Sequence, residues 1–242
     1  MTKDCTPLIS VVIPARNEAA YLPACLASIQ KAAGHVAGTV EIIVALNRCT
    51  DGTEQIAKEG GCEIVQNDSK NLAQVRNTGA RAARGEILVT IDADSTMSEK
   101  MLSCIYERLS SSAVVGGGVL ILPSRWSVGI FFSVLCLLPI ALFYRISCGL
   151  FYCYRHDFFA IGGFNEELSS VEDIDFAKRL RQHGKQTGRT FKTIFEASIT
   201  TSCRKFDTLG DWFFLRHPFM SLRLLRGKSQ SEANRVWYDI DR

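Results

Sequence analysis

Two aspartates, Asp92 and Asp94, stand two residues apart directly after an apolar run at residues 87–91. Alternate residues of an extended chain face the same side, so both carboxylates point one way if the chain stays extended there. Neighbouring carboxylates repel each other unless a cation lies between them, and Mg²⁺ binds one or two carboxylates together with phosphate and water. The pair indicates a divalent-metal site that a phosphorylated ligand completes. The simpler interpretation is a polar loop in which Asp92 caps the following helix.

A second acidic pair, Glu172 and Asp173, begins a predicted helix at residues 171–183. Neighbours in a helix point in different directions, so only one of the two fits a given site. The run from Ser169 to Glu172 also fits a capping box, and acidic residues stabilise helix N-termini. The two interpretations are compatible, because Glu172 can cap the helix while Asp173 serves as a general base.

Apolar runs and glycine or proline breaks predict alternating strands and helices in the first half of the chain. The predicted strands are residues 8–13, 40–46, 62–66 and 86–91, and the predicted helices are residues 19–33, 51–59, 71–83 and 98–109. Asn17 is the predicted N-cap of the first helix. Strands that are apolar throughout favour a sheet covered on both faces, and the β-α rhythm favours parallel strands. The fold class is therefore α/β, and ligands of such sheets bind at the carboxyl ends of the strands.

The second half of the chain is less regular. Its predicted strands are residues 114–122, 149–155 and 193–200, and glycines 116–118 interrupt the first of them. The helix at residues 171–183 is expected to stop at Gly184. A basic and aromatic helix is predicted at residues 206–226, with a kink at Pro218, and a polar tail follows it.

Composition and missing motifs exclude several function classes. The 242 residues contain 28 Lys and Arg against 25 Asp and Glu, and a net charge of +3 does not indicate nucleic-acid binding. The turn after the first predicted strand lacks the glycines of a dinucleotide-binding fold, and no GxxxxGK[ST] phosphate loop is present. The nine cysteines show no CxxC spacing, which favours reduced thiols in a cytosolic domain. We expect no export signal, because the N-terminal apolar run is short.

Four stretches of the chain together resemble the family 2 glycosyltransferases, which have a GT-A type fold. They are VVIPARNE at residues 11–18; NRCTDGT at 47–53; RNTG at 76–79 with GEILV at 85–89 and DAD at 92–94; and GGF at 162–164 with ED at 172–173. Their order and spacing agree over about residues 8–185. Each stretch alone is a weak signal, and the combination is specific.

The resemblance implies a role for each matching residue. Pro14, Ala15 and Glu18 would line a nucleotide pocket, Asn47 would face the base, and Arg76 would lie near the base or the diphosphate. Asp94 would bind Mg²⁺ or Mn²⁺, Asp92 would support the metal or contact the ribose, and Asp173 would be the catalytic base. The implied reaction is an inverting transfer of one sugar from a nucleotide-diphospho-sugar to a hydroxyl of a sugar, lipid or protein acceptor.

The chain also departs from the family pattern. The family often has two acidic or amide residues where Leu46-Asn47 stands, and a glycine and a serine where Arg48-Cys49 stands. No histidine follows Asp173 as an obvious further metal ligand, and the missing QxxRW pattern favours non-processive transfer. Two alternatives stay open: an inactive homologue that serves as a membrane-associated scaffold, and a nucleotidyltransferase, which would need a glycine-rich loop with a lysine near the first strand.

The expected organisation is a GT-A type domain at residues 1–202, with an apolar helical insertion at about 126–147, and a basic C-terminal region at 203–242. Residues 128–144 carry no charge, but 17 residues are short for a membrane span. A single span would also separate the acidic pair from Asp173, so the segment is buried, interfacial or re-entrant. Basic and aromatic residues mix in residues 203–228, which suits an anionic membrane surface. We therefore expect a cytoplasmic protein in peripheral contact with the inner face of the cell membrane, and no nucleic-acid partner.

Overall fold

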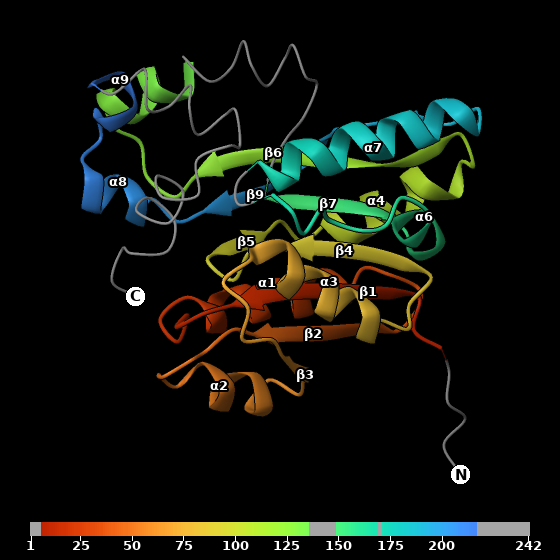
Figure 1. The fold of residues 1–242 in the computed structure, drawn as a ribbon, viewed down its shortest axis with the longest axis horizontal. Helices are drawn as coiled ribbons and strands as arrows, with labels where there is room; N and C mark the ends of the chain where they lie inside the picture. Colours follow the sequence, from red (N-terminus) through yellow and green to blue (C-terminus); the bar gives the residue numbers. More distant parts are fainter. Residues whose placement is uncertain (1–5, 136–148, 169–170, 217–242) are drawn as a thin grey trace.

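The computed structural model describes residues 6–135, 149–168 and 171–216 (Figure 1). The elements of the first half are β1 (Ile9–Ala15), α1 (Leu22–Ala33), β2 (Val40–Leu46), α2 (Thr53–Glu59), β3 (Glu63–Gln66), α3 (Leu72–Ala82), β4 (Ile87–Ile91), β5 (Ser95–Met97) and α4 (Met101–Ser110). Those of the second half are β6 (Val114–Pro123), β7 (Leu150–Tyr154), α6 (Arg155–Ala160), α7 (Glu172–Gln186), β8 (Thr190–Phe191), β9 (Ile194–Thr201), α8 (Arg204–Leu209) and α9 (Phe213–Arg216). The α/β class predicted from the sequence is confirmed.

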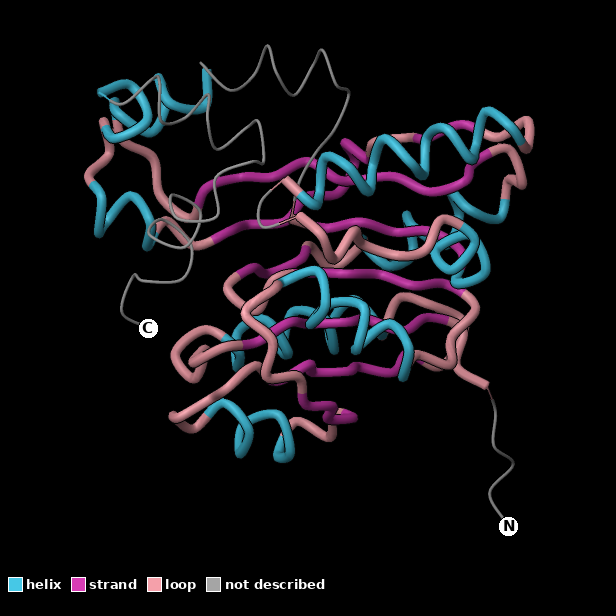
Figure 2. The backbone as a smooth tube through the Cα atoms, in the orientation of Figure 1, coloured by secondary structure: helices cyan, strands magenta, loops and turns pink. Residues whose placement is uncertain are grey.

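One sheet contains all the described strands, and it runs through the centre of the molecule (Figure 2). Its order is β3-β2-β1-β4-β7-β6-β9-β5, with β8 paired to β6. The strands β3, β2, β1 and β4 are mutually parallel, as the β-α rhythm predicts. β7 is antiparallel to both of its neighbours, and β5 is antiparallel to β9, so the second half of the sheet is mixed.

Helices cover both faces of this sheet and divide the core in two. Val11 and Ile13 of β1 point to the layer that contains α1 and α4, whereas Val12 points to the layer of α3, α6 and α7. All seven residues of β1 are buried, which explains why its sequence is apolar without alternation. The carboxyl ends of β1, β2 and β4 thereby meet at one edge of the sheet.

The first helix begins later than predicted, and Asn17 does not cap it. Its first residue is Leu22, preceded by Tyr21, and the proline at its second position suits a helix start. Asn17 has a positive φ of 50°, and its side chain accepts a hydrogen bond from the backbone N–H of Thr50 at 2.8 Å. The residues between β1 and α1 therefore form a loop at the sheet edge instead of the predicted first turn of the helix.

The glycines of β6 do not interrupt the strand as predicted. β6 runs from Val114 to Pro123, and a Cβ added at Gly117 would lie 1.6 Å from the carbonyl oxygen of Lys192. A Cβ at Gly116 would lie 2.4 Å from the Tyr152 carbonyl oxygen. The glycines instead let the backbone of β6 approach its neighbours closely.

Several predicted element ends are wrong. The short elements β5, α6 and β8 were not predicted, and α7 continues through Gly184 to Gln186. α7 begins at Glu172, after Val171 with its left-handed φ of 58°, and Ser169 of the predicted capping box lies outside the described residues. The single basic helix is wrong as well, because Gly210 (φ 88°) separates α8 from α9.

The apolar insertion is described only in part. Residues 128–135 are helical, and the predicted segment from 136 to 147 lies outside the described residues, as do Pro218 and the polar tail. Within the described ranges, no helix combines the length and the apolar character needed to cross a membrane.

Candidate active site

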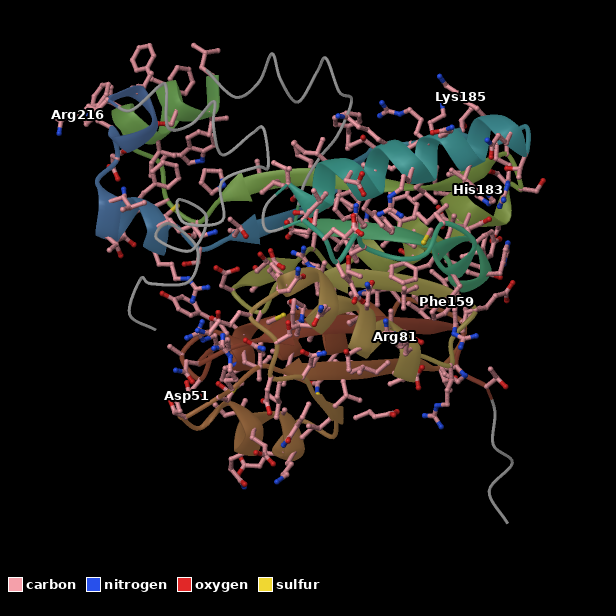
Figure 3. The ribbon with its side chains drawn as sticks, viewed as in Figure 1. Asp51, Arg81, Phe159, His183, Lys185 and Arg216 are labelled. Carbon is pink, nitrogen blue, oxygen red and sulfur yellow. The ribbon has the colours of Figure 1, made fainter. Side chains whose placement is uncertain are left out.

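The edge formed by the carboxyl ends of β1, β2 and β4 gathers most of the predicted site residues. Pro14 and Ala15 are the last residues of β1, and the Ala15 carbonyl accepts a hydrogen bond from the Asn47 N–H at 2.8 Å. Asp51, in the loop after β2, lies at this end of the sheet in Figure 3, and Arg81, Phe159 and His183 lie toward the other end.

Asn47 is buried and holds two loops together. Its amide nitrogen donates hydrogen bonds to the backbone carbonyls of Asn67 at 2.6 Å and of Ser69 at 2.7 Å. Its side chain thus joins the end of β2 to the loop between β3 and α3. The structure places Asn47 at the predicted edge, with its amide engaged by backbone.

The buried Arg76 of α3 forms the centre of a cluster of three carboxylates, whose side chains are 12–38% exposed. Its Nη1 donates to Glu172 at 2.9 Å and to Asp173 at 2.8 Å, and its Nη2 donates to Asp92 at 2.8 Å. The arginine side chain is 4% exposed, and its guanidinium lies 5.2 Å from the centre of the Phe164 ring. One cation therefore holds three carboxylates that come from β4 and α7.

This arrangement gives Glu172 a partner other than the predicted capping box. Its carboxylate accepts from Arg76, and Ser169 of that box lies outside the described residues. Arg76 joins Asp92 of the predicted metal pair to the predicted base Asp173, rather than projecting alone toward a ligand.

The protonation behaviour of Asp173 differs from that of a surface aspartate. Burial raises the pKa of Asp173 to about 7, and repulsion by Glu172 and Asp92 adds to the effect, against the opposing attraction of Arg76. The three carboxylates outnumber the single arginine, so the cluster stabilises a proton on one of them. A carboxyl group whose pKa lies near neutrality is suited to accept a proton from a substrate and release it to water.

A second arginine binds the other carboxylates of the site. Arg204, the first residue of α8, donates from Nη1 to Glu18 at 2.7 Å and from Nη2 to the other Glu18 oxygen at 2.8 Å. Its Nη2 also lies 3.0 Å from Asp94 Oδ2. Burial and repulsion by Asp92 raise the pKa of Asp94, and Arg204 opposes this shift.

The donor set suits a hard divalent cation that brings ligands of its own. Asp92 and Asp94 offer carboxylate oxygens at one strand end, and Mg²⁺ commonly binds one or two carboxylates with phosphate and water. Within the described ranges, no group of three or more His, Cys, Asp or Glu side chains forms a complete metal site.

Sequence reasoning missed two residues of this region. Arg204 was counted with the basic C-terminal region, although it follows the last strand, β9, just as the predicted residues follow theirs. Asn77 was missed because it lies inside α3. Its amide binds the Phe164 carbonyl at 2.9 Å, and its oxygen accepts from the Phe164 N–H at 2.9 Å. This pair of bonds fixes Gly162-Gly163-Phe164 as a turn whose Phe164 side chain is buried.

Comparison with known proteins places this geometry in a family. Residues 10–127 match the model of glycosyl transferase family 2. Residues 10–127 therefore carry a domain similar to family 2 glycosyltransferases. The PGL/p-HBAD biosynthesis glycosyltransferase of Mycobacterium tuberculosis is 29% identical over 230 residues, which cover 90% of this chain and 86% of that protein.

Other similarities are more local or concern the fold. Glycosyltransferase GlyG of Streptococcus pneumoniae serotype 4 is 29% identical over 108 residues, and the match spans 42% of this chain and only 35% of GlyG. The mannosyltransferase PcManGT from Pyrobaculum calidifontis, solved with GDP-Man and Mn²⁺, superposes with a TM-score of 0.65 at 18% identity, covering 96% of this chain and 68% of that one. The GT-A type fold implied by the sequence is confirmed.

Proposed function

We propose that this glycosyltransferase transfers one sugar from a nucleotide-diphospho-sugar to an acceptor hydroxyl, with inversion at the anomeric carbon and with a divalent metal. The observation that carries the proposal is the linkage of Asp173 to Asp92 through Arg76, within 2.8 Å of each carboxylate. This linkage supports a catalytic base at Asp173 on one side of Arg76 and a donor site at Asp92 on the other side.

Asp173 accepts the proton of the acceptor hydroxyl in this mechanism. The acceptor oxygen forms a bond to the anomeric carbon while the bond to the nucleoside diphosphate breaks, and the diphosphate leaves with the electron pair. Inversion follows from this single displacement. The pKa of about 7 lets Asp173 take the proton near neutral pH and return it to solvent.

The donor side of the site is assigned to residues that follow the first, second and fourth strands, with Arg76 near the base or the diphosphate. Pro14, Ala15, Glu18 and Asn47 line the nucleotide pocket, Asp92 would support the metal or contact the ribose, and Asp94 would hold the metal. Bound Mg²⁺ or Mn²⁺ supplies positive charge that neutralises the departing diphosphate. The PcManGT structure, solved with GDP-Man and Mn²⁺, supports this choice of donor and metal.

A thermal-shift panel of UDP-, GDP- and dTDP-sugars with Mg²⁺ or Mn²⁺ tests the proposal. The matching donor is expected to stabilise the fold by about 2.7 kcal/mol at a hundredfold excess over its dissociation constant. Asp94→Asn is expected to remove the metal dependence of this shift. Asp51→Asn, in the loop after β2, is the control for a carboxylate outside the metal pair. A panel in which no nucleotide-sugar stabilises the protein would contradict the donor assignment.

We also propose peripheral contact with the inner face of the cell membrane. The support is an exposed apolar surface formed by side chains that are 37–66% exposed, namely Trp126, Val128, Phe131, Phe132, Val134, Leu135 and Trp212. Phe132 stacks on Trp212 at 6.2 Å, which joins residues 128–135 to the α8–α9 segment. Apolar side chains gathered in this way suit the interface of a bilayer.

Flotation with anionic vesicles tests the membrane contact. Phe131→Asp in the full chain is expected to abolish flotation, because it places a charge in the apolar surface. The control is Phe195→Asp, which changes an aromatic side chain that is 70% exposed at the start of β9. Equal flotation of both variants and the unaltered protein would contradict the contact. Flotation without turnover of any nucleotide-sugar would favour an inactive membrane scaffold.

A further inference from the structure

Arg204 connects the last strand of the fold to the metal pair. Its two terminal nitrogens bind both oxygens of Glu18, at 2.7 and 2.8 Å, and one of them lies 3.0 Å from Asp94. The guanidinium also lies 5.2 Å from the centre of the Tyr21 ring. The contacts join two strand ends to α8 at the carboxylate assigned to the metal.

Two carboxylates of low exposure face Arg204 at this point. Glu18 and Asp94 are 3% and 13% exposed, and Lys205 adds a second positive charge that acts on Asp94. A divalent cation on Asp94 would repel Arg204 and compete with it for the same carboxylate. A guanidinium that loses one anionic partner here gains another if a phosphate arrives with the metal, since its planar fork binds phosphate as well as carboxylate.

We propose that Arg204 is a binding residue for the diphosphate of the donor, which exchanges Asp94 for a phosphate oxygen when a divalent cation takes its place on Asp94. Glu18 keeps its hold on the guanidinium through this exchange and sets its direction. The inference rests on the proposed function, because it takes the donor to be a nucleoside diphosphate ester. It adds a residue of the C-terminal region to the leaving-group site.

The test compares Arg204→Gln, Arg204→Lys and Arg125→Gln in the full chain. Arg125 is the matched control: its guanidinium binds Asp207 at 2.6 Å and Asp211 at 2.7 Å, so it fastens the same α8–α9 segment without contacting Glu18 or Asp94. Calorimetry measures Mn²⁺ binding alone, and then the binding of UDP, GDP and dTDP with Mn²⁺ present.

Opposite changes in two affinities are expected for Arg204→Gln. Mn²⁺ alone binds several-fold more tightly, because its competitor on Asp94 is gone. The nucleoside diphosphate binds roughly tenfold to a hundredfold more weakly, the loss of one or two charge-assisted hydrogen bonds. Arg204→Lys keeps the charge without the fork and is expected to fall between these values, while Arg125→Gln resembles the unaltered protein.

Three outcomes would overturn the proposal. Arg204→Gln could weaken Mn²⁺ and the nucleotide alike, or leave nucleotide affinity unchanged, and either result assigns Arg204 a structural role only. If Arg204→Gln fails to fold, Arg204→Lys decides the matter, since unaltered nucleotide affinity in that variant excludes a diphosphate fork. Failure of the unaltered protein to bind any of the three nucleotides with Mn²⁺ would instead refute the proposed function itself.

Discussion

Two arginines hold the carboxylates of this site, and they differ in burial and in origin. Arg76 is 4% exposed and binds three carboxylates, whereas Arg204 is 20% exposed and binds two. Arg76 comes from α3, which packs on β1 and β2, and Arg204 from α8, which has no buried residue. Arg76 is therefore part of the core, whereas Arg204 lies where it can exchange partners.

The surroundings of each arginine support this division. The guanidinium of Arg76 lies over Phe164, which itself stacks on Phe176 at 4.4 Å, so moving Arg76 requires repacking of an aromatic core. Arg204 lies on α8, which has no buried residue, so its release from Asp94 is expected to need no repacking of the core. The base side of the site is therefore rigid, and the donor side can respond to a ligand.

Arg76→Gln is expected to cause the largest loss in the free energy of unfolding. Removing the cation leaves Asp92, Glu172 and Asp173 as uncompensated charges, and a loss of about 3–5 kcal/mol in the free energy of unfolding is expected. Urea denaturation measures the loss. Arg81→Gln on the same helix is the control, because Arg81 is 60% exposed and its contact with Glu166 is worth less than about 1 kcal/mol. Equal losses in the two variants would contradict a core role for Arg76.

Arg204→Gln is expected to cause a smaller loss in the free energy of unfolding, and a divalent metal is expected to reverse it. Arg204 is 20% exposed, against 4% for Arg76, and it leaves two carboxylates rather than three, so we expect about 1–3 kcal/mol. Saturating Mn²⁺ replaces the missing charge at Asp94 and restores the free energy of unfolding, whereas it restores nothing in Arg76→Gln. Urea denaturation of both variants with and without Mn²⁺ measures the free energy of unfolding. An equal gain on adding Mn²⁺ to both variants would contradict the difference between Arg76 and Arg204.

The pH dependence of sugar transfer tests the role of Asp173 as the base. Asp173 must be deprotonated to accept a proton, so kcat/KM is expected to rise tenfold per pH unit below its pKa and to level off above about 7. Glu172→Gln removes a like charge that raises the pKa of Asp173, so the rise is expected at lower pH. A profile with the same midpoint in both proteins would show that Glu172 does not act on the base.

Sequence reasoning predicts the first half of this fold well, for a physical reason. β1 and β4 are apolar without alternation and are buried along their whole length, whereas β2 is buried only in its second half and the edge strand β3 is half-buried or exposed. Glycines follow the first two helices, α1 and α2. The predicted ends of elements are wrong where a side chain binds a residue that is distant in the sequence. Asn17 binds Thr50 instead of capping a helix, and Glu172, expected to cap α7, binds Arg76 on another helix.

The candidate site is predictable only in part for the same reason. Asp92, Asp94 and Asp173 stand out because they follow a strand or begin a helix. The ion pair between Glu18 and Arg204 joins residues 186 positions apart, and the pairing of β9 with β5 brings the start of α8 to the metal pair. No local pattern separates Arg204 from the other basic residues of the C-terminal region.

The most direct test of the account measures donor binding and sugar transfer in the same preparation of Asp173→Asn. Removing the base is expected to slow transfer by about 10²–10⁴-fold while donor affinity with Mn²⁺ stays unchanged. Asp175→Asn is the control on the same helix, since Asp175 binds Arg179 at 2.7 Å and does not contact Arg76. Full transfer by Asp173→Asn, or a loss of donor affinity without a slower transfer step, would contradict the assignment of Asp173 as the base.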